Sequence, residues 1–177
     1  ILSTKPYGTK ATSPTTRPTT RPVGRPTLSV GVAQADNETK EGIVLAGSSN
    51  VTLAKYNFRT TGSGFMIKKL KFTTPNPAAI GELSFWNGSN QISTLGGGHL
   101  SYEGELPLFT IGPNSEMIVT VKANIRRIGE GAKTGADVAL TLVGTEGEFL
   151  AVASNDQSVR VTGLGISLTG KSKVVRK

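Results

Sequence analysis

Apolar side chains recur at every second residue along most of this chain, and this alternation constrains the fold more than any other feature. In residues 50–58, Ala54, Tyr56 and Phe58 fall on one side of an extended backbone, and the positions between them are polar. The same spacing recurs in residues 117–123, and no segment keeps the apolar spacing of a helix over three turns. A period of two is the signature of a strand that buries one face. We therefore predict an all-β chain.

Clusters of glycine, proline and asparagine separate the alternating segments. The expected strands cover residues 28–32, 50–58, 65–72, 81–86, 106–111, 117–123, 136–143, 148–153, 158–162 and 166–168. Short strands without helices between them predict antiparallel pairing. The fold class we expect is an antiparallel two-sheet β-sandwich of about 8–10 strands, immunoglobulin-like or jelly-roll-like. We also expect residues 50–60 and 64–74 to form a central hairpin.

The first 26 residues have a different composition from the rest of the chain. They hold five of the nine prolines, and the sequence Pro-Thr-Thr-Arg occurs twice. Because proline fixes φ and removes a backbone donor, this segment is incompatible with a helix or a central strand. We expect an extended, polyproline-like arm or linker. The chain thus divides into a basic Pro/Thr/Arg arm (1–26), a β-sandwich domain (27–170) and a basic terminal strand or tail (171–177).

Positive charge is concentrated at the two ends of the chain, whose formal net charge is +8. The arm carries five basic residues and no acidic one, and residues 171–177 carry four basic residues. A nucleic-acid-binding domain normally places basic and aromatic residues together on a folded face, whereas the ends hold only one aromatic residue, Tyr7. We predict no specific nucleic-acid binding. Nonspecific attraction to an anionic cell-wall polymer or glycan stays open.

The residue types that most enzymes need are scarce. The chain has no cysteine and a single histidine, His99, which excludes thiol nucleophiles, cysteine-ligated metals and multi-histidine metal sites. Ser63 lies between two glycines but without the strand–turn–helix context of a nucleophile elbow. Glu103 and Glu105 resemble a glycosidase pair, although such spacing on a polar strand edge is more typical of solubilising charge. We predict a non-enzymatic protein without catalytic residues, cofactor or metal.

Two acidic clusters, at residues 36–38 and 155–156, lack the spaced oxygen ligands of a calcium loop. No apolar run approaches the ~20 residues of a membrane-spanning helix. Trp86 has two interpretations, a carbohydrate-stacking platform or a lid on the core. Candidate glycan acceptors are the asparagines of three Asn-x-Ser/Thr sequences, which also arise by chance in such a chain, and threonines of the arm: Asn37, Asn50, Asn87, Thr15, Thr16, Thr19 and Thr20.

Three segments carry a resemblance to a known class of proteins. Residues 25–30, 51–61 and 67–73 read RPTLSV, VTLAKYNFRTT and IKKLKFT, and the chain closes on VVRK at 174–177. Over residues 25–177 this pattern resembles the tandem β-sandwich repeats of large surface-layer-like or adhesin-like proteins of candidate-phyla (Parcubacteria-like) bacteria. The resemblance implies a structural role at the cell surface and no catalytic residues. The Pro/Thr/Arg arm is a departure from that pattern.

We expect an extracellular subunit or repeat of a surface layer, sheath or filament that assembles with copies of itself. Sheet edges carry unpaired backbone groups that accept an added strand, and the arm and the terminal strand are the expected contacts. The candidate interface residues are apolar and basic side chains of these two segments: Leu2, Tyr7, Arg17, Arg21, Val23, Arg25, Ile166, Leu168, Val174 and Val175. Two alternatives stay open, a glycan-binding or adhesive module on a Pro/Thr linker and a virion surface or decoration protein.

Overall fold

The structure is a computed structural model that describes residues 24–33 and 40–177. Within these residues the secondary structure is almost entirely β, with one short 3-10 helix (Pro77–Ala79) and no α-helix. The predicted all-β sandwich class is confirmed. Residues 1–23 of the predicted arm lie outside the described residues, and so does the acidic cluster at residues 36–38.

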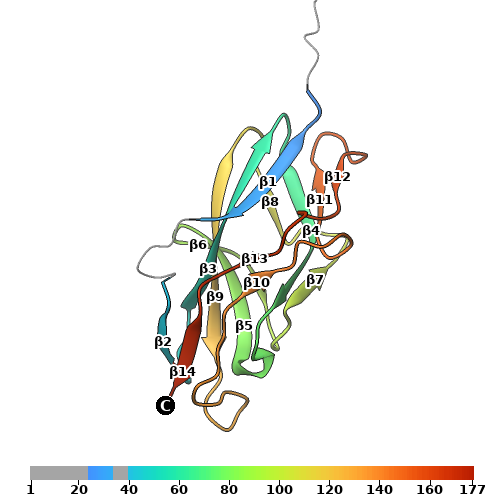
Figure 1. The fold of residues 1–177 in the computed structure, drawn as a ribbon. Coiled ribbons are helices and arrows are strands. Elements are labelled where there is room, and N and C mark those ends of the chain that lie inside the picture. Colours follow the sequence, from blue (N-terminus) through green and yellow to red (C-terminus); the bar gives the residue numbers. More distant parts are fainter. Residues whose placement is uncertain (1–23, 34–39) are drawn as a thin grey trace, which may run out of the picture.

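The first sheet has five antiparallel strands (Figure 1). In spatial order they are β1 (Thr27–Val32), β3 (Val51–Thr61), β9 (Glu116–Ile125), β5 (Ile80–Asn87) and β6 (Asn90–Leu95). The second sheet follows the order β12 (Arg160–Val161), β11 (Leu150–Ala153), β4 (Phe65–Thr73), β10 (Thr141–Leu142) and β13 (Leu168–Thr169). β4 also pairs with β7 (Ser101–Glu103) and β8 (Phe109–Ile111), along the edge of β4 opposite to β10 and β11.

A third, two-stranded unit joins distant parts of the chain. The last strand, β14 (Lys173–Arg176), pairs in parallel with β2 (Gly42–Leu45). The order β1-β3-β9-β5 corresponds to the A-B-E-D sheet of the immunoglobulin topology. In the second sheet, β4 corresponds to strand C. Strand F corresponds to β10 and β11 together, and strand G to β12 and β13 together. The topology is therefore immunoglobulin-like, with strands F and G each broken into shorter pieces.

The expected hairpin of residues 50–60 and 64–74 is wrong, because β3 and β4 belong to different sheets. The chain crosses between the sheets at a glycine-rich turn. Gly62 has a φ of +79°, which favours glycine. A Cβ on Gly64 would lie only 2.6 Å from the carbonyl oxygen of Ile111, so the close approach of these two segments requires glycine. Alternation alone does not reveal such a change of sheet.

Aromatic rings form the centre of the core between the two sheets. Tyr56, Phe72, Phe85, Phe109 and Phe58 make a continuous series in which neighbouring ring centroids lie 5.5 to 6.0 Å apart. These separations are typical of favourable aromatic contacts. On β9, the alternation predicts that Met117, Val119, Val121 and Ala123 point inward; the last three are each no more than 1% exposed, and Met117 is half-buried against the core.

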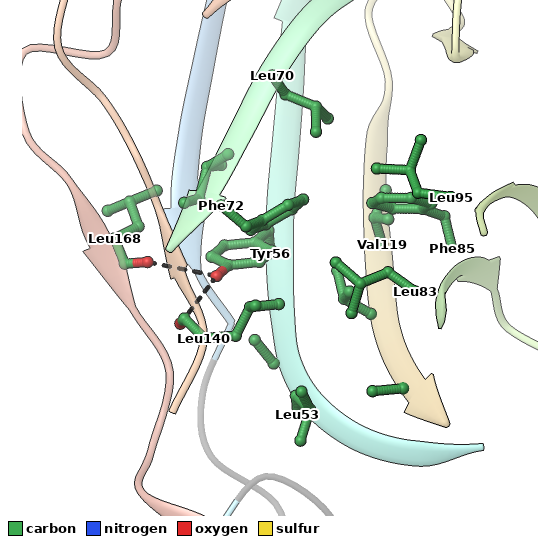
Figure 2. Packing of buried hydrophobic residues seen from close by; sticks show 14 of the residues in the cluster. Leu53, Tyr56, Leu70, Phe72, Leu83, Phe85, Leu95, Val119, Leu140 and Leu168 are labelled. Carbon is green, nitrogen blue, oxygen red and sulfur yellow. Dashed lines mark hydrogen bonds between the residues drawn. The ribbon is translucent and has the colours of Figure 1, made fainter. Parts of the chain in front are cut away.

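The hydroxyl group of Tyr56 links the sheets by hydrogen bonds as well as by packing. It lies 3.3 Å from the carbonyl oxygen of Leu140 and 3.3 Å from that of Leu168 (Figure 2). Leu140 immediately precedes β10, and Leu168 begins β13. A residue of the first sheet thus holds two neighbouring strands of the second. Burial raises the pKa of the Tyr56 phenol well above its usual value.

Replacing Tyr56 with phenylalanine should lower the free energy of unfolding by about 1 kcal/mol, because it removes the buried hydroxyl that donates to the carbonyl oxygens of Leu140 and Leu168. Urea denaturation followed by far-UV circular dichroism measures the change. The matched control is Tyr102→Phe, whose hydroxyl donates to the carbonyl oxygen of Leu106 in an exposed position. Equal losses for the two variants would contradict the role given to Tyr56.

Alkaline pH should destabilise the protein through the same phenol. Burial raises the folded-state pKa of Tyr56 above the ordinary tyrosine value of about 10, so above pH 10 the unfolded chain loses this proton first. The free energy of unfolding should then fall by up to about 1.4 kcal/mol per pH unit. Urea titrations between pH 9 and 12 measure this slope. It should be smaller in Tyr56→Phe, and equal slopes would rule out this cause.

Candidate functional site

The described part of the arm, Gly24–Pro26, is held at one end of the sandwich; we call these three residues the arm root. A Cβ on Gly62 would lie 3.4 Å from the Cα of Pro26 and 3.5 Å from the carbonyl oxygen of Gly24. The arm root therefore runs directly over the turn between β3 and β4. In Figure 1 it continues β1 past the end of the sandwich.

A second turn faces the arm root at this end of the domain. Asp156, between β11 and β12, accepts a hydrogen bond from the hydroxyl of Ser158 at 2.6 Å. This bond is the main cause of the lowered pKa of the Asp156 carboxyl, and the positive charge of Arg25 adds to it. The exposed Arg25 is thus the one candidate interface residue of the arm that lies within the described chain. The candidates Leu2, Tyr7, Arg17, Arg21 and Val23 lie outside it.

The terminal strand lies at the opposite end of the sandwich and belongs to the domain (Figure 1). β14 pairs with β2 along one edge. Along its other edge, the amides of Gly135 and Val138 donate to the carbonyl oxygens of Val175 and Lys173, at 2.8 and 2.9 Å. Both edges of β14 are therefore occupied within the same chain. Residues 171–177 were expected to form a separate terminal segment, but four of them are integrated into the fold.

The four candidate interface residues near the C-terminal end differ in exposure. Leu168 is 6% exposed and Val175 is fully buried, and both belong to the core cluster. Val174 is half-buried beside Ile43 of β2, whereas Ile166 is 66% exposed. The side chains of Leu168 and Val175 are thus used inside the domain, and Ile166 is the apolar candidate that faces solvent.

The end of the tail is fixed by a nearly buried lysine. Lys173 is 7% exposed, and its Nζ donates to the carbonyl oxygen of Lys40 at 2.9 Å. On the neighbouring strand, Ile43 and Leu45 are 67% and 58% exposed. Sequence analysis missed this apolar pair, because the four apolar and small residues of β2 do not alternate with polar ones.

The strand β1 provides an open sheet edge. Among the described residues it pairs with β3 alone, and the amide of Ala33 donates to the carbonyl oxygen of Lys55 at 2.9 Å. Antiparallel strands direct the backbone groups of alternate residues toward and away from their partner. The backbone groups of Leu28, Val30 and Val32 therefore face away from β3. This edge is one of the expected strand-acceptor surfaces.

Trp86 is not a lid on the core. It lies on the outer face of the first sheet, because Leu83 and Phe85 point into the core cluster and Trp86 does not belong to it. Its Nε1 donates to the hydroxyl of Ser84 at 2.8 Å, and the Nζ of Lys122 lies 4.7 Å from the ring centroid. Tyr56 is in the core and Tyr102 is on the other sheet, so the three side chains form no common aromatic platform.

The remaining candidate residues lie apart from one another. Asn50 and Asn87 are exposed, and Asn37, Thr15, Thr16, Thr19 and Thr20 lie outside the described residues. His99 is exposed, and Glu103 pairs with Lys69 at 2.9 Å. Within residues 24–33 and 40–177, no three His, Asp or Glu side chains gather closely enough to hold a metal ion. The same part of the chain has no helix long and apolar enough to cross a membrane.

Comparison with known proteins gives only distant similarities. No family model and no curated protein matches the chain. A solved structure of a family 123 glycoside hydrolase from Clostridium perfringens aligns with 86% of this chain at 14% identity and a TM-score of 0.39, and the chain spans 27% of that hydrolase. The CssB subunit of enterotoxigenic Escherichia coli colonization factor CS6, complemented with a donor strand from CssA, aligns over 84% of this chain and 97% of CssB, at 13% identity and a TM-score of 0.38. Such low scores carry no functional argument.

Truncating Val175 to alanine should lower the free energy of unfolding by about 2 kcal/mol, because the change leaves a cavity where a fully buried side chain was packed. The control is Ile166→Ala, an exposed position whose truncation should change stability by less than about 0.5 kcal/mol. Chemical denaturation of both variants at low protein concentration measures this. If Val175→Ala had no effect there, the tail would not be part of the monomer's core.

Proposed function

We propose that this protein is an extracellular, non-enzymatic structural subunit or repeat of a surface layer, sheath or filament, joined to neighbouring copies through its basic arm. In this proposal the folded sandwich is the building block and the arm makes the connection. The proposal includes a role like that of the surface-protein repeats that residues 25–177 resemble. A virion surface layer would use the same contacts between copies.

The observation that carries the proposal is the position of the arm root relative to the last strand, β14. The arm root leaves one end of the sandwich in line with β1, and β14 ends at the other (Figure 1). A contact made by the arm of one copy on the body of another is heterologous, and repeated heterologous contacts build open filaments or closed rings. Ends on opposite sides of the domain favour such head-to-tail order.

The role of the terminal strand in this proposal differs from the one expected from the sequence. Both edges of β14 are paired within its own domain, and its Val175 is fully buried. Donating β14 to another copy would therefore require part of its own domain to unfold. We therefore assign the joining role to the arm alone. The cationic C-terminal residues Arg176 and Lys177 are exposed and suit contact with an anionic wall polymer.

A glycan-binding role is the second candidate, and the observation that favours it is the pairing of Trp86 with Lys122. A half-buried indole ring beside an ammonium group offers a stacking surface and a positive charge to an acidic sugar. Binding of uronic-acid oligosaccharides that is lost in Trp86→Ala would support this role.

Deleting residues 1–23 should leave a folded monomer that no longer assembles. The core cluster lies between Val44 and Val175, so the sandwich keeps all of its core after the deletion. Light scattering and negative-stain electron microscopy measure assembly, and circular dichroism checks the fold. The matched control replaces residues 1–23 by a neutral Gly/Ser segment of equal length. Unchanged assembly of the deletion variant would refute the proposal.

A further inference from the structure

The outer face of the second sheet is hollowed along β4. Two adjoining depressions of about 570 and 380 Å³ lie there. The first contains Met66, and the second contains Lys68, Leu150 and Val152. Met66 from the first and Val152 from the second pair in register on β4 and β11, so the two hollows are neighbours along these strands. We call the combined hollow over these four residues the β4 trough.

Three of the four residues under the β4 trough are apolar although they face away from the core, and the fourth, Lys68, is positively charged. Val152 is 4% exposed but does not belong to the core cluster, which contains its neighbours Ala151 and Ala153. In the same way, Phe65 and Ile67 belong to the core cluster, whereas Met66 between them does not. Because successive strand residues point to opposite faces, Met66 and Val152 point outward. Val152 is already covered within the domain, so the half-buried Met66 and Leu150 give a partner the apolar surface to cover.

The two walls of the trough differ in charge. Glu103 and Glu105 stand on the wall formed by β7 and the segment after it, and Arg160 stands on the opposite wall. The side chain of Glu103 is 72% exposed even though it pairs with Lys69, and Glu105 is exposed as well. The lining of the second hollow as a whole holds two carboxylates and two cations, Lys68 and Arg160, so it is the carboxylate wall that suits a segment combining basic and apolar residues.

We propose that the β4 trough binds the Pro/Thr/Arg arm, residues 1–23, of a neighbouring copy of this chain; this inference rests on the proposed function. The arm combines basic residues with proline rings and contains no acidic residue. Proline rings would pack on Met66 and Leu150, and Arg17 or Arg21 would pair with Glu103 and Glu105. Partly exposed carboxylates of this kind contribute modestly and salt-dependently, so most of the affinity comes from covering the floor.

The chemistry of proline favours a trough on a sheet face over an open sheet edge. Proline at every fourth position of residues 14–26 removes amide donors on one side of an extended chain and favours a polyproline-like conformation over a regular strand. Pro-rich segments are commonly recognised through side-chain packing in grooves. This preference favours the face of the second sheet over the β1 edge as the binding site of the arm.

The arm root lies against Gly62, which also borders the first hollow, but its direction favours a neighbouring copy over the arm's own domain. It continues β1 past the end of the sandwich instead of turning over the face of the second sheet (Figure 1). At about 3 Å per residue, 23 extended residues reach roughly 70 Å, well beyond a domain diameter of roughly 40 Å. The arm is long enough to cross to the next domain and lie along its trough.

A direct test titrates a fluorescein-labelled synthetic peptide of residues 1–23 into the variant that lacks these residues and follows fluorescence anisotropy. We expect saturable binding that weakens at least tenfold in Met66→Asp and at least threefold in the double variant Glu103→Gln, Glu105→Gln. The matched control, Glu130→Gln, changes an exposed glutamate in the loop after β9 and should bind like the parent. Circular dichroism verifies that each variant is folded.

The outcomes separate this inference from the proposed function. If the arm deletion abolishes assembly but the trough variants bind the peptide like the parent, the trough inference is overturned and the proposed function stands. If the deletion variant still assembles, the proposed function fails whatever the peptide does. A third outcome is that the peptide binds the deletion variant, whereas the full chain stays monomeric and does not bind the peptide. In that case the arm occupies the trough of its own domain, and the assignment to a neighbouring copy is overturned.

Discussion

The hydroxyl of Tyr56 connects the parts of this molecule on which its proposed role depends. It bonds to the carbonyl oxygens of Leu140 and Leu168 and thereby fixes two short strands, β10 and β13, that have few ladder bonds of their own. The chain from Leu168 leads directly into β14, which pairs with β2 and completes the domain. Because the last strand is used internally, the arm is left as the segment that can join one copy to another.

The strands with clean alternation could be predicted from the sequence, and the pairing between them could not. Tyr56 and Phe58 on β3, and Val119 and Val121 on β9, point inward as their spacing indicates. β2 was missed because its apolar residues do not alternate with polar ones, and β6 because its sequence, NQISTL, is mostly polar. The assignment of β3 and β4 to one hairpin failed because Gly64 lets the chain change sheets, which no periodicity records.

Only the part of the candidate site that rests on local sequence features could be predicted. The charge and proline content of the arm can be recognised in the sequence without any structure. The β4 trough cannot, because Val152 reads as one more apolar residue of a strand, and only the pairing of β4 with β11 shows that it faces outward. Likewise, Trp86 looks like a core residue until its neighbours Leu83 and Phe85 are seen to occupy the inner face.

The placement of the first and last strands at opposite ends also has a mechanical consequence. A load that pulls on the arm root and on the end of β14 acts along the strand axes, so β1 would slide along β3 and β14 along β2. In this shear geometry the backbone hydrogen bonds of each pair bear the force together instead of opening one after another. Resistance to such forced unfolding is governed by the rate of unfolding and not by equilibrium stability. In the proposed assembly, a sandwich with this strand arrangement would be suited to carrying tension between joined copies.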